Sequence, residues 1–364
     1  MSQPRQQTVR LIGSSMRIVR TLNENAWKEF VACQQMGNIF HTPEMYRVYE
    51  RVEGFLPTVW AVESCDGRIL SLLLPVQINL LGHLLRRFSS RSVVFGGVLS
   101  ENGAEGEAAL DLLLRSYVGE SGGGSLFTEL RNLSSMESNR AILLKNGFMH
   151  EDHLNFLINL DHSPDELLQS IGHRTRKLIR RGLRVAQVAM EEVSTPEGVA
   201  ACYRILTKTY ENARVPLAPF SLFKAAFDLL LPKGMVKFSL ARVDGIPVAT
   251  SVELLYKKTM FGWYGGVDRS YNEYNPNELL TWTILQWGAM NGYTVYDFGG
   301  AGKPNEKYGV RDFKAKFGGE LVNFGRNTYV HAPGLLRLSR FGYQLMRRYL
   351  SRTDSSGIRT VPMA

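Results

Sequence analysis

Short apolar runs bounded by turn residues alternate along this chain with longer apolar stretches of helical spacing. In the second half, runs that favour strands surround one long stretch that favours a helix. The helix is predicted to begin after Asn275, with Pro276 in its first position and Glu278 closing a capping box, and to end at Gly292. Strands are predicted at about residues 235–242, 246–256, 259–265, 295–298 and 320–329.

The same order of runs occurs in the first half of the chain, which indicates an internal repeat. The segment Phe95-Gly96-Gly97-Val98 recurs as Tyr264-Gly265-Gly266-Val267, an offset of 169 residues (264 − 95). An Asp-Gly hairpin turn near residue 66 recurs near residue 244, an offset of 178 (244 − 66), so the first copy has a longer segment around residues 83–87. Two further motifs repeat at the offset of 169, residues 126–128 with 295–297 and residues 145–148 with 314–317. We therefore predict two copies of one domain.

The order of elements within each copy indicates the fold class. A mostly antiparallel sheet that continues into a parallel strand-helix-strand unit is the arrangement of GNAT-type acyltransferases. We predict an α/β (α+β) fold of two tandem GNAT-like domains at residues 16–162 and 163–332, each a mixed, mostly antiparallel sheet flanked by helices. Residues 333–350 are predicted to form an amphipathic helix, and residues 1–15 and 351–364 to be flexible tails. A length of 364 residues fits two domains better than one hydrophobic core.

Two predicted helices carry cations on one face, in a chain whose formal net charge is +9. At about 100° per residue, the cations of residues 171–184 fall on one side of a helix that contains no acid. They are Arg174, Arg176, Lys177, Arg180, Arg181 and Arg184. The face is either a plain solvated surface or a site for phosphates of tRNA or of a lipid diphosphate. The C-terminal helix either covers its own domain or lies at a membrane surface.

Glycine, aromatic and charged residues concentrate between residues 261 and 318. Glycines at strand ends let a ligand approach the backbone closely, and in a GNAT-like sheet a substrate amide can pair with an exposed strand edge there. The alternative is that the glycines only turn the chain and the aromatic residues belong to the core. The candidate substrate-binding residues are Trp263, Tyr264, Gly265, Tyr274, Tyr296, Tyr308, Arg311 and Phe313.

Three motifs of this region carry a family resemblance. Tyr264-Gly-Gly-Val, Tyr296-Asp297-Phe298-Gly299-Gly300 and Phe313-Lys314-x-x-Phe317-Gly318 together resemble the C-terminal half of the Fem-type (FemAB) aminoacyltransferases. The resemblance covers most of residues 165–330 and, more weakly, the first copy. It implies tandem GNAT-like domains that move an amino acid from aminoacyl-tRNA onto the peptide of a lipid-linked cell-wall precursor. It also implies that Lys314 is a functional residue.

Acyl transfer chemistry gives Lys314 and Asp297 candidate catalytic roles. The reaction needs a neutral amine and stabilisation of the oxyanion, and a lysine beside a splayed strand could supply the second. Asp297 could relay the amine proton or orient a neighbour, or simply cap a turn. The first copy has Thr128 and Lys145 at the equivalent positions, so we predict that it mainly binds.

The sequence gives little support to covalent catalysis, nucleotide binding or a metal site. The one Gly-x-Ser-x-Gly match, at residues 119–123, lies between a predicted helix and a predicted strand, the reverse of a nucleophile elbow. There is no glycine-rich nucleotide-binding motif and no cysteine pair with metal-ligand spacing. We therefore expect direct transfer without a covalent intermediate, no metal, and no cofactor besides the donor substrate. No apolar run approaches the roughly 18 residues of a spanning helix, and residues 1–15 lack a signal-peptide core. We expect a cytoplasmic protein, with peripheral contact at the cytoplasmic face of the membrane as a further expectation.

Three functions are compatible with these features. The first is an aminoacyltransferase that uses aminoacyl-tRNA and an amine of a lipid-linked envelope precursor. The second is an acyl-CoA-dependent N-acyltransferase for an amino sugar or surface-polysaccharide precursor, although residues 272–277 lack the usual CoA pyrophosphate motif. The third is a non-catalytic protein that binds RNA or anionic lipid through the basic helix.

Overall fold

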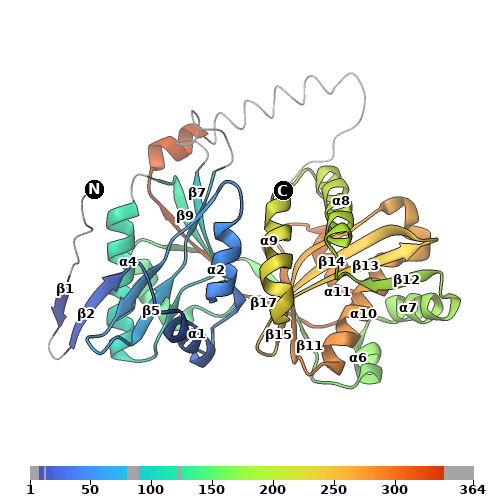
Figure 1. The fold of residues 1–364 in the computed structure, drawn as a ribbon, viewed down its shortest axis with the longest axis horizontal. Coiled ribbons are helices and arrows are strands. Elements are labelled where there is room, and N and C mark those ends of the chain that lie inside the picture. The colour runs from blue at the N-terminus through green and yellow to red at the C-terminus, as the bar shows by residue number, and fades with distance from the viewer. Residues whose placement is uncertain (1–7, 12–13, 80–89, 122–123, 340–364) are drawn as a thin grey trace. The chain divides into compact units, whose positions relative to one another are not determined.

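A computed structural model describes residues 8–11, 14–79, 90–121 and 124–339, and these form two compact units (Figure 1). The first unit takes residues up to Glu50, Gly54–Asp152 and residues from Phe324 onward. The second unit takes Arg51–Glu53 and His153–Asn323. The chain therefore enters the second unit near residue 153 and returns to the first after residue 323.

The first unit contains two sheets around helix α4. Their strand orders are β1-β2-β4-β5-β8 and β10-β18-β9-β7-β6-β3. Helix α4 packs on β4 and β5, where Leu110 and Leu113 are fully buried. The strands are β1 (Thr8–Leu11), β2 (Ser14–Val19), β3 (Phe55–Pro57), β4 (Trp60–Glu63), β5 (Ile69–Leu73), β6 (Val76–Ile78), β7 (Arg91–Gly96), β8 (Leu99–Ser100), β9 (Phe127–Asn132), β10 (Met149–Glu151) and β18 (Arg326–Val330). The helices are α1 (Glu24–Cys33), η1 (Ile39–His41), α2 (Pro43–Glu50), α4 (Ala104–Ser121), η3 (Glu137–Asn139) and α5 (Arg140–Lys145).

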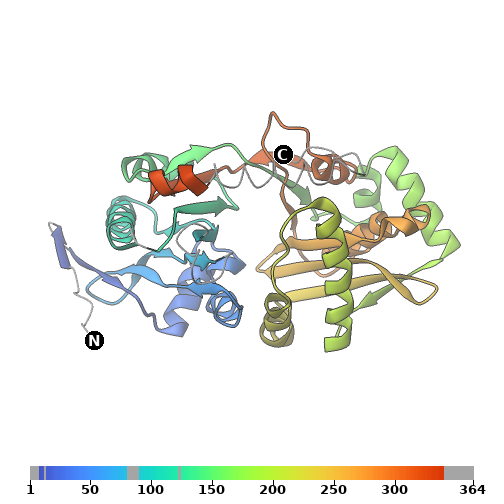
Figure 2. The same cartoon turned by 90° about the horizontal axis from the view of Figure 1, so that it is seen from above.

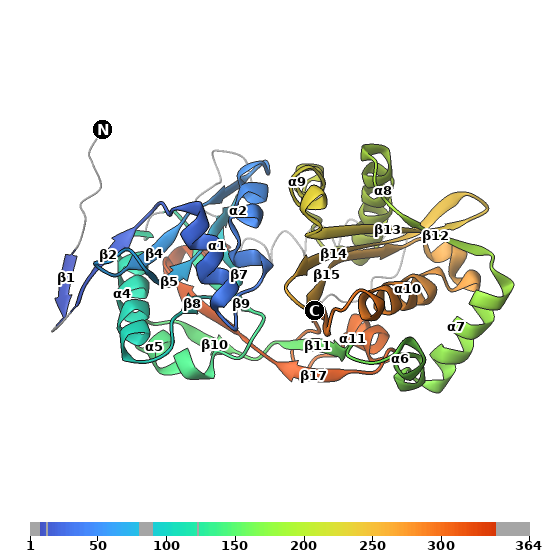
Figure 3. The ribbon, with the colours of Figure 1, turned by 60° about the horizontal axis from the view of Figure 1, so that its bottom comes forward.

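The second unit is built on one seven-stranded sheet of order β12-β13-β14-β15-β16-β11-β17. Helices α8 and α9 cover one face, and α10 covers the other with α6 and α7 packed against it (Figure 3). The strands are β11 (Leu154–Asn159), β12 (Val188–Glu192), β13 (Val236–Val243), β14 (Ile246–Tyr256), β15 (Thr259–Val267), β16 (Val295–Gly300) and β17 (Glu320–Asn323). The helices are α6 (Pro164–Ser170), α7 (His173–Val185), α8 (Pro196–Ala213), α9 (Phe220–Leu230), η4 (Leu231–Lys233), η5 (Arg269–Tyr274), α10 (Pro276–Met290) and α11 (Gly309–Ala315).

The internal repeat is confirmed by the register of two parallel strand pairs. Ser92 pairs with Thr128 between β7 and β9, and Phe261 pairs with Asp297 between β15 and β16. Both residues of the second pair lie 169 positions after those of the first (261 − 92 and 297 − 128). The two copies thus place equivalent residues at equivalent positions in their sheets.

The strand predicted at residues 320–329 is wrong as a single element. It is two strands in different sheets: β17 pairs with β11 in the second unit, and β18 pairs with β9 in the first. Gly325, with φ of +66°, separates them. In Figure 2 the red C-terminal strand and helix accordingly lie among the green elements of the first unit.

The last strand of the first half makes the reciprocal exchange. Strand β11 lies between β16 and β17 of the second unit. The predicted boundary between residues 162 and 163 therefore falls instead at 152/153, with a second crossing at 323/324. An apolar strand has the same side-chain alternation in either sheet, so the sequence pattern does not reveal which sheet it joins.

Several element ends differ from the predictions. Helix α10 begins at Pro276 as predicted, but Asn275 adopts a left-handed conformation (φ +52°) and its side chain caps nothing. Glu278 does not close a capping box; it forms an ion pair with Lys316 at 3.1 Å. Part of the predicted N-terminal tail, strand β1, pairs with β2.

The C-terminal predictions lie only partly within the described residues. Residues 333–339 are helical, and two of their apolar side chains, Leu335 and Leu338, are exposed. Residues 340–350, the tail 351–364 and the segment 83–87 lie outside the described ranges. Within those ranges, no helix combines the length and the apolar character needed to cross a bilayer.

Candidate functional site

The seam between strands β15 and β16 is where the second sheet opens. Their parallel pairing covers only Thr259–Phe261 with Val295–Asp297. Gly262 and Gly299 still lie close, since a Cβ on Gly299 would be 3.4 Å from the Gly262 carbonyl oxygen. Beyond them β15 runs to Val267 and β16 to Gly300 with no further pairing between the two in the described structure. The diverging edges match the splayed strands expected of a GNAT-like sheet.

The opposite edge of β15 is distorted at the same level. The register between β14 and β15 shifts between Val252, which pairs with Tyr264, and Glu253, which pairs with Gly262. Trp263 is therefore the extra residue of a β-bulge. A bulge bends its strand and increases the local twist, and here it turns the second half of β15 away from β16.

Lys314 lies at the end of β16, carried there by helix α11. Its side chain is buried, and its ammonium group donates to the carbonyl oxygens of Phe298 (2.5 Å), Gly299 (3.2 Å) and Gly300 (2.8 Å). These three bonds use all three donors of a lysine. Fully buried Phe317, one turn later, fixes the segment in the core. Lys314 therefore shapes the diverging end of β16 and brings a buried positive charge to it.

Asp297 lies on β16 just before the strands separate. It is buried, and its carboxylate accepts hydrogen bonds from the Gly299 N–H at 2.7 Å and from the Asn155 side-chain amide at 3.3 Å. Burial raises the pKa of Asp297 to about 6, although the Gly299 N–H and the charge of Lys314 oppose the rise. Burial lowers the pKa of Lys314 to about 8, partly offset by Asp297. An acid and a base whose pKa values converge on neutrality are suited to proton transfer.

Asn155 and Glu253 are site residues that the sequence analysis missed. Asn155 belongs to β11, the exchanged strand, so its place beside Asp297 depends on a crossing that the sequence does not show. Glu253 is a fully buried carboxyl on β14, and burial raises its pKa to about 8 despite the nearby Ser251, Lys237 and Tyr296. The one available sequence signal was an acid inside the otherwise apolar run 252–255.

Gly262 makes room for Tyr296, the residue of β16 that lies near Glu253. A Cβ on Gly262 would lie 2.8 Å from the Tyr296 hydroxyl oxygen, so the tyrosine crosses over β15 at this residue. Ser251 donates a hydrogen bond to Glu253, and the other carboxyl oxygen, Oε2, has no partner among the described residues. A buried polar path thus runs beneath the seam from Glu253 to Tyr296, next to Asp297.

The predicted substrate-binding residues separate into distinct groups. Trp263 and Tyr264 are half-buried on β15, with the Tyr264 ring 4.7 Å from that of Phe223 on α9, and Gly265 is exposed. Tyr296 does not face this surface, because it lies in the core. Trp263, Tyr264 and Gly265 therefore border the open seam, whereas Tyr296 supports it from within.

The remaining predicted residues lie around helices α10 and α11. Arg311 donates to the carbonyl oxygens of Ala301 (2.7 Å) and Pro304 (3.2 Å), so it braces the loop that follows β16. Phe313 packs on Phe317, with ring centroids 5.3 Å apart. Two tyrosines complete the set: Tyr308, which precedes α11 and is exposed, and Tyr274, which ends η5 before α10.

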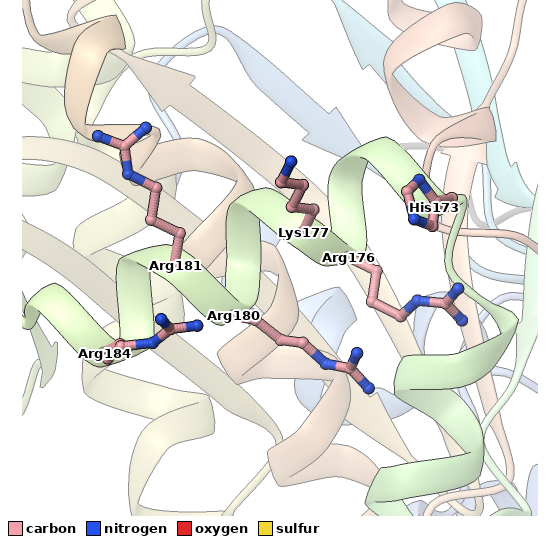
Figure 4. Close-up of a pocket in the computed structure, with 6 residues that line it drawn as sticks. All are labelled: His173, Arg176, Lys177, Arg180, Arg181 and Arg184. Atoms are coloured by element: carbon pink, nitrogen blue, oxygen red, sulfur yellow. The ribbon is translucent and has the colours of Figure 1, made fainter.

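The predicted cationic face is helix α7. Its cations surround an open cavity of about 370 Å³, which we call the α7 groove (Figure 4). The groove is lined by His173, Arg176, Lys177, Arg180, Arg181 and Arg184. The predicted phosphate-binding residue Arg174 is exposed but is not among them, and His173 is an addition. Leu183, an apolar residue of the same helix, is exposed.

Comparisons with known proteins agree with this geometry. Residues 170–314 match the family model of the acetyltransferase (GNAT) domain. Over 105 residues the chain is 29% identical to a lipid II:glycine glycyltransferase of Staphylococcus saprophyticus, a match that covers 27% of this chain and 25% of that relative. The match thus spans a quarter of the relative's length.

Two solved structures share the fold over most of this chain. FemX superposes with a TM-score of 0.69 at 16% identity, covering 88% of this chain and 99% of FemX. A tandem GNAT protein from the clavulanic acid biosynthesis pathway gives a TM-score of 0.57 at 11% identity, covering 88% and 99%. These matches confirm the predicted fold class of two tandem GNAT-like domains.

Proposed function

We propose that this chain, an acyltransferase with a GNAT domain and a similarity to Fem-type proteins, moves an amino acid from aminoacyl-tRNA to an amine of a lipid-linked cell-envelope precursor. The glycyltransferase relative is named for lipid II and glycine, and we carry over only the class of reaction and of acceptor. An acceptor with a lipid anchor requires work at the cytoplasmic face of the membrane, which makes peripheral contact part of the proposal.

The observation that carries the proposal is the open seam with a buried charge at its end. The edge of β15 beyond Gly262, which no longer pairs with β16, offers backbone groups that can hold the acyl donor. The ammonium of Lys314 and the carboxyl of Asp297 lie where β16 leaves the seam. We assign to Lys314 the stabilisation of the negative charge that acyl transfer generates, and to Asp297 the transfer of the proton.

The proposed reaction is a direct attack. The acceptor amine adds to the ester carbonyl carbon of the donor, which leaves a negative charge on the carbonyl oxygen. The positive charge of Lys314 stabilises it through its electrostatic field, while the three ammonium donors remain on the carbonyl oxygens of β16. The C–O bond to the ribose then breaks, the amine nitrogen loses a proton, and the ribose oxygen gains one. With a pKa of about 6, Asp297 is largely ionised at neutral pH and can accept and return this proton.

The test offers the purified chain a panel of aminoacyl-tRNAs and acyl-CoAs together with a lipid-linked precursor extract, and reads products by mass spectrometry. We expect a precursor heavier by one aminoacyl residue only when a charged tRNA is present. Lys314→Ala should remove the product, and Lys145→Ala should retain it. A product formed from acyl-CoA alone would replace this function with the alternative below.

The alternative is an acyl-CoA-dependent N-acyltransferase acting on an amino sugar or surface-polysaccharide precursor. It is favoured by the match to a family described as acetyltransferase. The start of α10, where GNAT enzymes usually bind the CoA pyrophosphate, opposes it. Pro276 removes one backbone donor there, and Asn275 stands in a left-handed turn where the usual motif has glycine.

A further inference from the structure

The α7 groove concentrates positive charge that has no counter-charge nearby. Its lining contains five Arg or Lys side chains and one histidine, and no carboxylate. Cations elsewhere usually have an acidic partner, as Lys237 has Glu192 and Lys208 has Asp268. Within the described part of the chain, Arg176 hydrogen-bonds the backbone and side chain of Gln169 at 2.7 and 2.8 Å, and no lining residue forms an ion pair.

The length of the cationic row indicates the kind of anion it fits. From His173 to Arg184 the row spans 11 residues, which at 1.5 Å per residue is about 16 Å along the helix. A lipid headgroup or a free phosphate would engage two or three of these side chains. Several consecutive phosphates of a nucleic-acid strand can engage the whole row.

The apolar side of α7 is already in use, which argues against insertion into a membrane. Thr175 and Ile179 are buried, and a Cβ on Gly182 would lie 2.7 Å from the Leu279 side chain of α10. An interfacial helix needs a free apolar face. The exposed Leu183 and Val185 lie about 200° apart around the helix, so they cannot form one.

The groove begins beside the segment that carries Lys314. The Gly172 N–H, just before α7, donates to the Lys316 carbonyl oxygen at 3.1 Å. A Cβ on Gly318 would lie 2.9 Å from the Ser170 carbonyl oxygen. The start of α7 is thus attached to the end of α11, two residues from Lys314. A strand held in the groove therefore lies on the element next to the proposed acyl-transfer residues.

We propose that the α7 groove binds the phosphate backbone of an RNA strand. The contacts are to phosphates alone, so they position the RNA without reading its sequence. That the RNA is the donor tRNA rests on the proposed function; the binding of RNA does not.

The test measures binding of deacylated bulk tRNA to the full chain over a range of salt concentrations. Lys177→Glu, Arg181→Glu and Arg184→Glu combined should raise Kd at least about 100-fold and lower the slope of log Kd against log salt by about 3, one unit per lost phosphate contact. The control combines Arg115→Glu, Arg140→Glu and Lys145→Glu, exposed cations of the first unit that give the same change in net charge. It should leave both quantities nearly unchanged.

Two further arms make the outcome decisive. If the α7 variant and the control weaken tRNA binding equally, or neither does, the groove is a solvated surface and the proposal is wrong. If the α7 variant loses binding to phosphatidylglycerol vesicles but keeps tRNA, the groove serves a membrane. Because deacylated tRNA cannot be turned over, these results do not depend on the reaction. A chain that uses only acyl-CoA would overturn the proposed function and leave the RNA result intact.

Discussion

The equivalent parallel strand pairs of the two domain copies differ in how far they stay paired. In the first unit, β7 and β9 pair continuously from Ser92–Thr128 to Gly96–Asn132. In the second unit, the pairing of β15 and β16 stops at Phe261–Asp297, the counterpart of Ser92–Thr128. Four successive pairs that close the first seam are therefore missing from the second. One fold thus gives a closed sheet in one copy and an open strand edge in the other.

The side chains along the two strand pairs also favour a closed sheet in the first unit and an open one in the second. Val76 pairs with Val93 in the first sheet, whereas Glu253 pairs with Gly262 at the equivalent place in the second. The first combination fills the space with apolar side chains. The second leaves a gap over glycine, which the Tyr296 hydroxyl enters above a buried acid.

The equivalent lysines follow the same division. Lys145 is exposed and forms an ion pair with Asp111 at 3.1 Å, while Lys314 is buried and bonded to three carbonyl oxygens. The comparison teaches that this fold acquires an open seam by placing glycine and ionisable groups where packing would otherwise close it. The open copy is the one expected to react.

The largest expected effect comes from Lys314→Ala. It should lower kcat/KM by about 100-fold or more, the scale of one lost oxyanion-stabilising group. Lys314→Arg should rescue poorly, because a planar guanidinium does not fit three carbonyl oxygens arranged around one ammonium. Steady-state kinetics on variants shown to be folded by circular dichroism provide the measurement. Near-native turnover of Lys314→Ala would move the site away from this seam.

Glu253→Gln should change how stability depends on pH. The pKa of Glu253 is about 8 in the folded chain against an ordinary value of 4.5. Its protonation therefore stabilises the fold fully below about pH 4.5, and this contribution is lost as the pH rises through about 8. The stability advantage of the glutamine variant over the native chain should therefore be about 2–3 kcal/mol larger at pH 9 than at pH 6. Urea denaturation at both pH values tests this, and parallel curves for the two chains would contradict it.

Gly262→Ala should begin to convert the open seam into the closed one. The new methyl group would stand 2.8 Å from the buried Tyr296 hydroxyl oxygen, so the tyrosine has to move, at a cost of about 1–2 kcal/mol. The control is Gly265→Ala, whose methyl group would be 3.8 Å from its nearest neighbour, the Thr250 carbonyl oxygen. Midpoints of urea denaturation compare the two. Equal losses would show that the space over Gly262 has no special role.

The smallest effect is expected from Lys145→Ala in the closed copy. The side chain is 66% exposed, and exposed ion pairs contribute about 0–1 kcal/mol. Stability should change by less than about 1 kcal/mol, and kcat/KM should stay within about twofold of the native value, measured beside Lys314→Ala. A loss of turnover here would mean that the first unit takes part in the reaction.

The repeat and most of the strands could be predicted from the sequence, because turn residues and apolar runs determine local structure. Once the structure shows that Ser92 pairs with Thr128, the offset of 169 residues predicts that Phe261 pairs with Asp297. The strand exchange could not, because pairing between distant strands leaves no local pattern. Asn155 was missed for that reason.

The sequence predicted which types of residue form the candidate site, but it did not predict the contacts that these residues make. The motif around Lys314 indicated a functional lysine, but nothing in the sequence shows that its ammonium group meets three carbonyl oxygens of one turn. Glu253 lies in a correctly predicted strand, but only the seven-stranded sheet shows that β14 is central and its acid buried.

The exchange of β11 and β18 also sets an order of events during synthesis. The six-stranded sheet of the first unit lacks the strand beside β9 until residues 326–330 leave the ribosome, 194 residues after β9 ends (326 − 132). At roughly 5–20 residues per second, that strand edge waits about 10–40 s for its partner. The six-stranded sheet of the first unit is therefore completed only after every strand of the second unit has been synthesised.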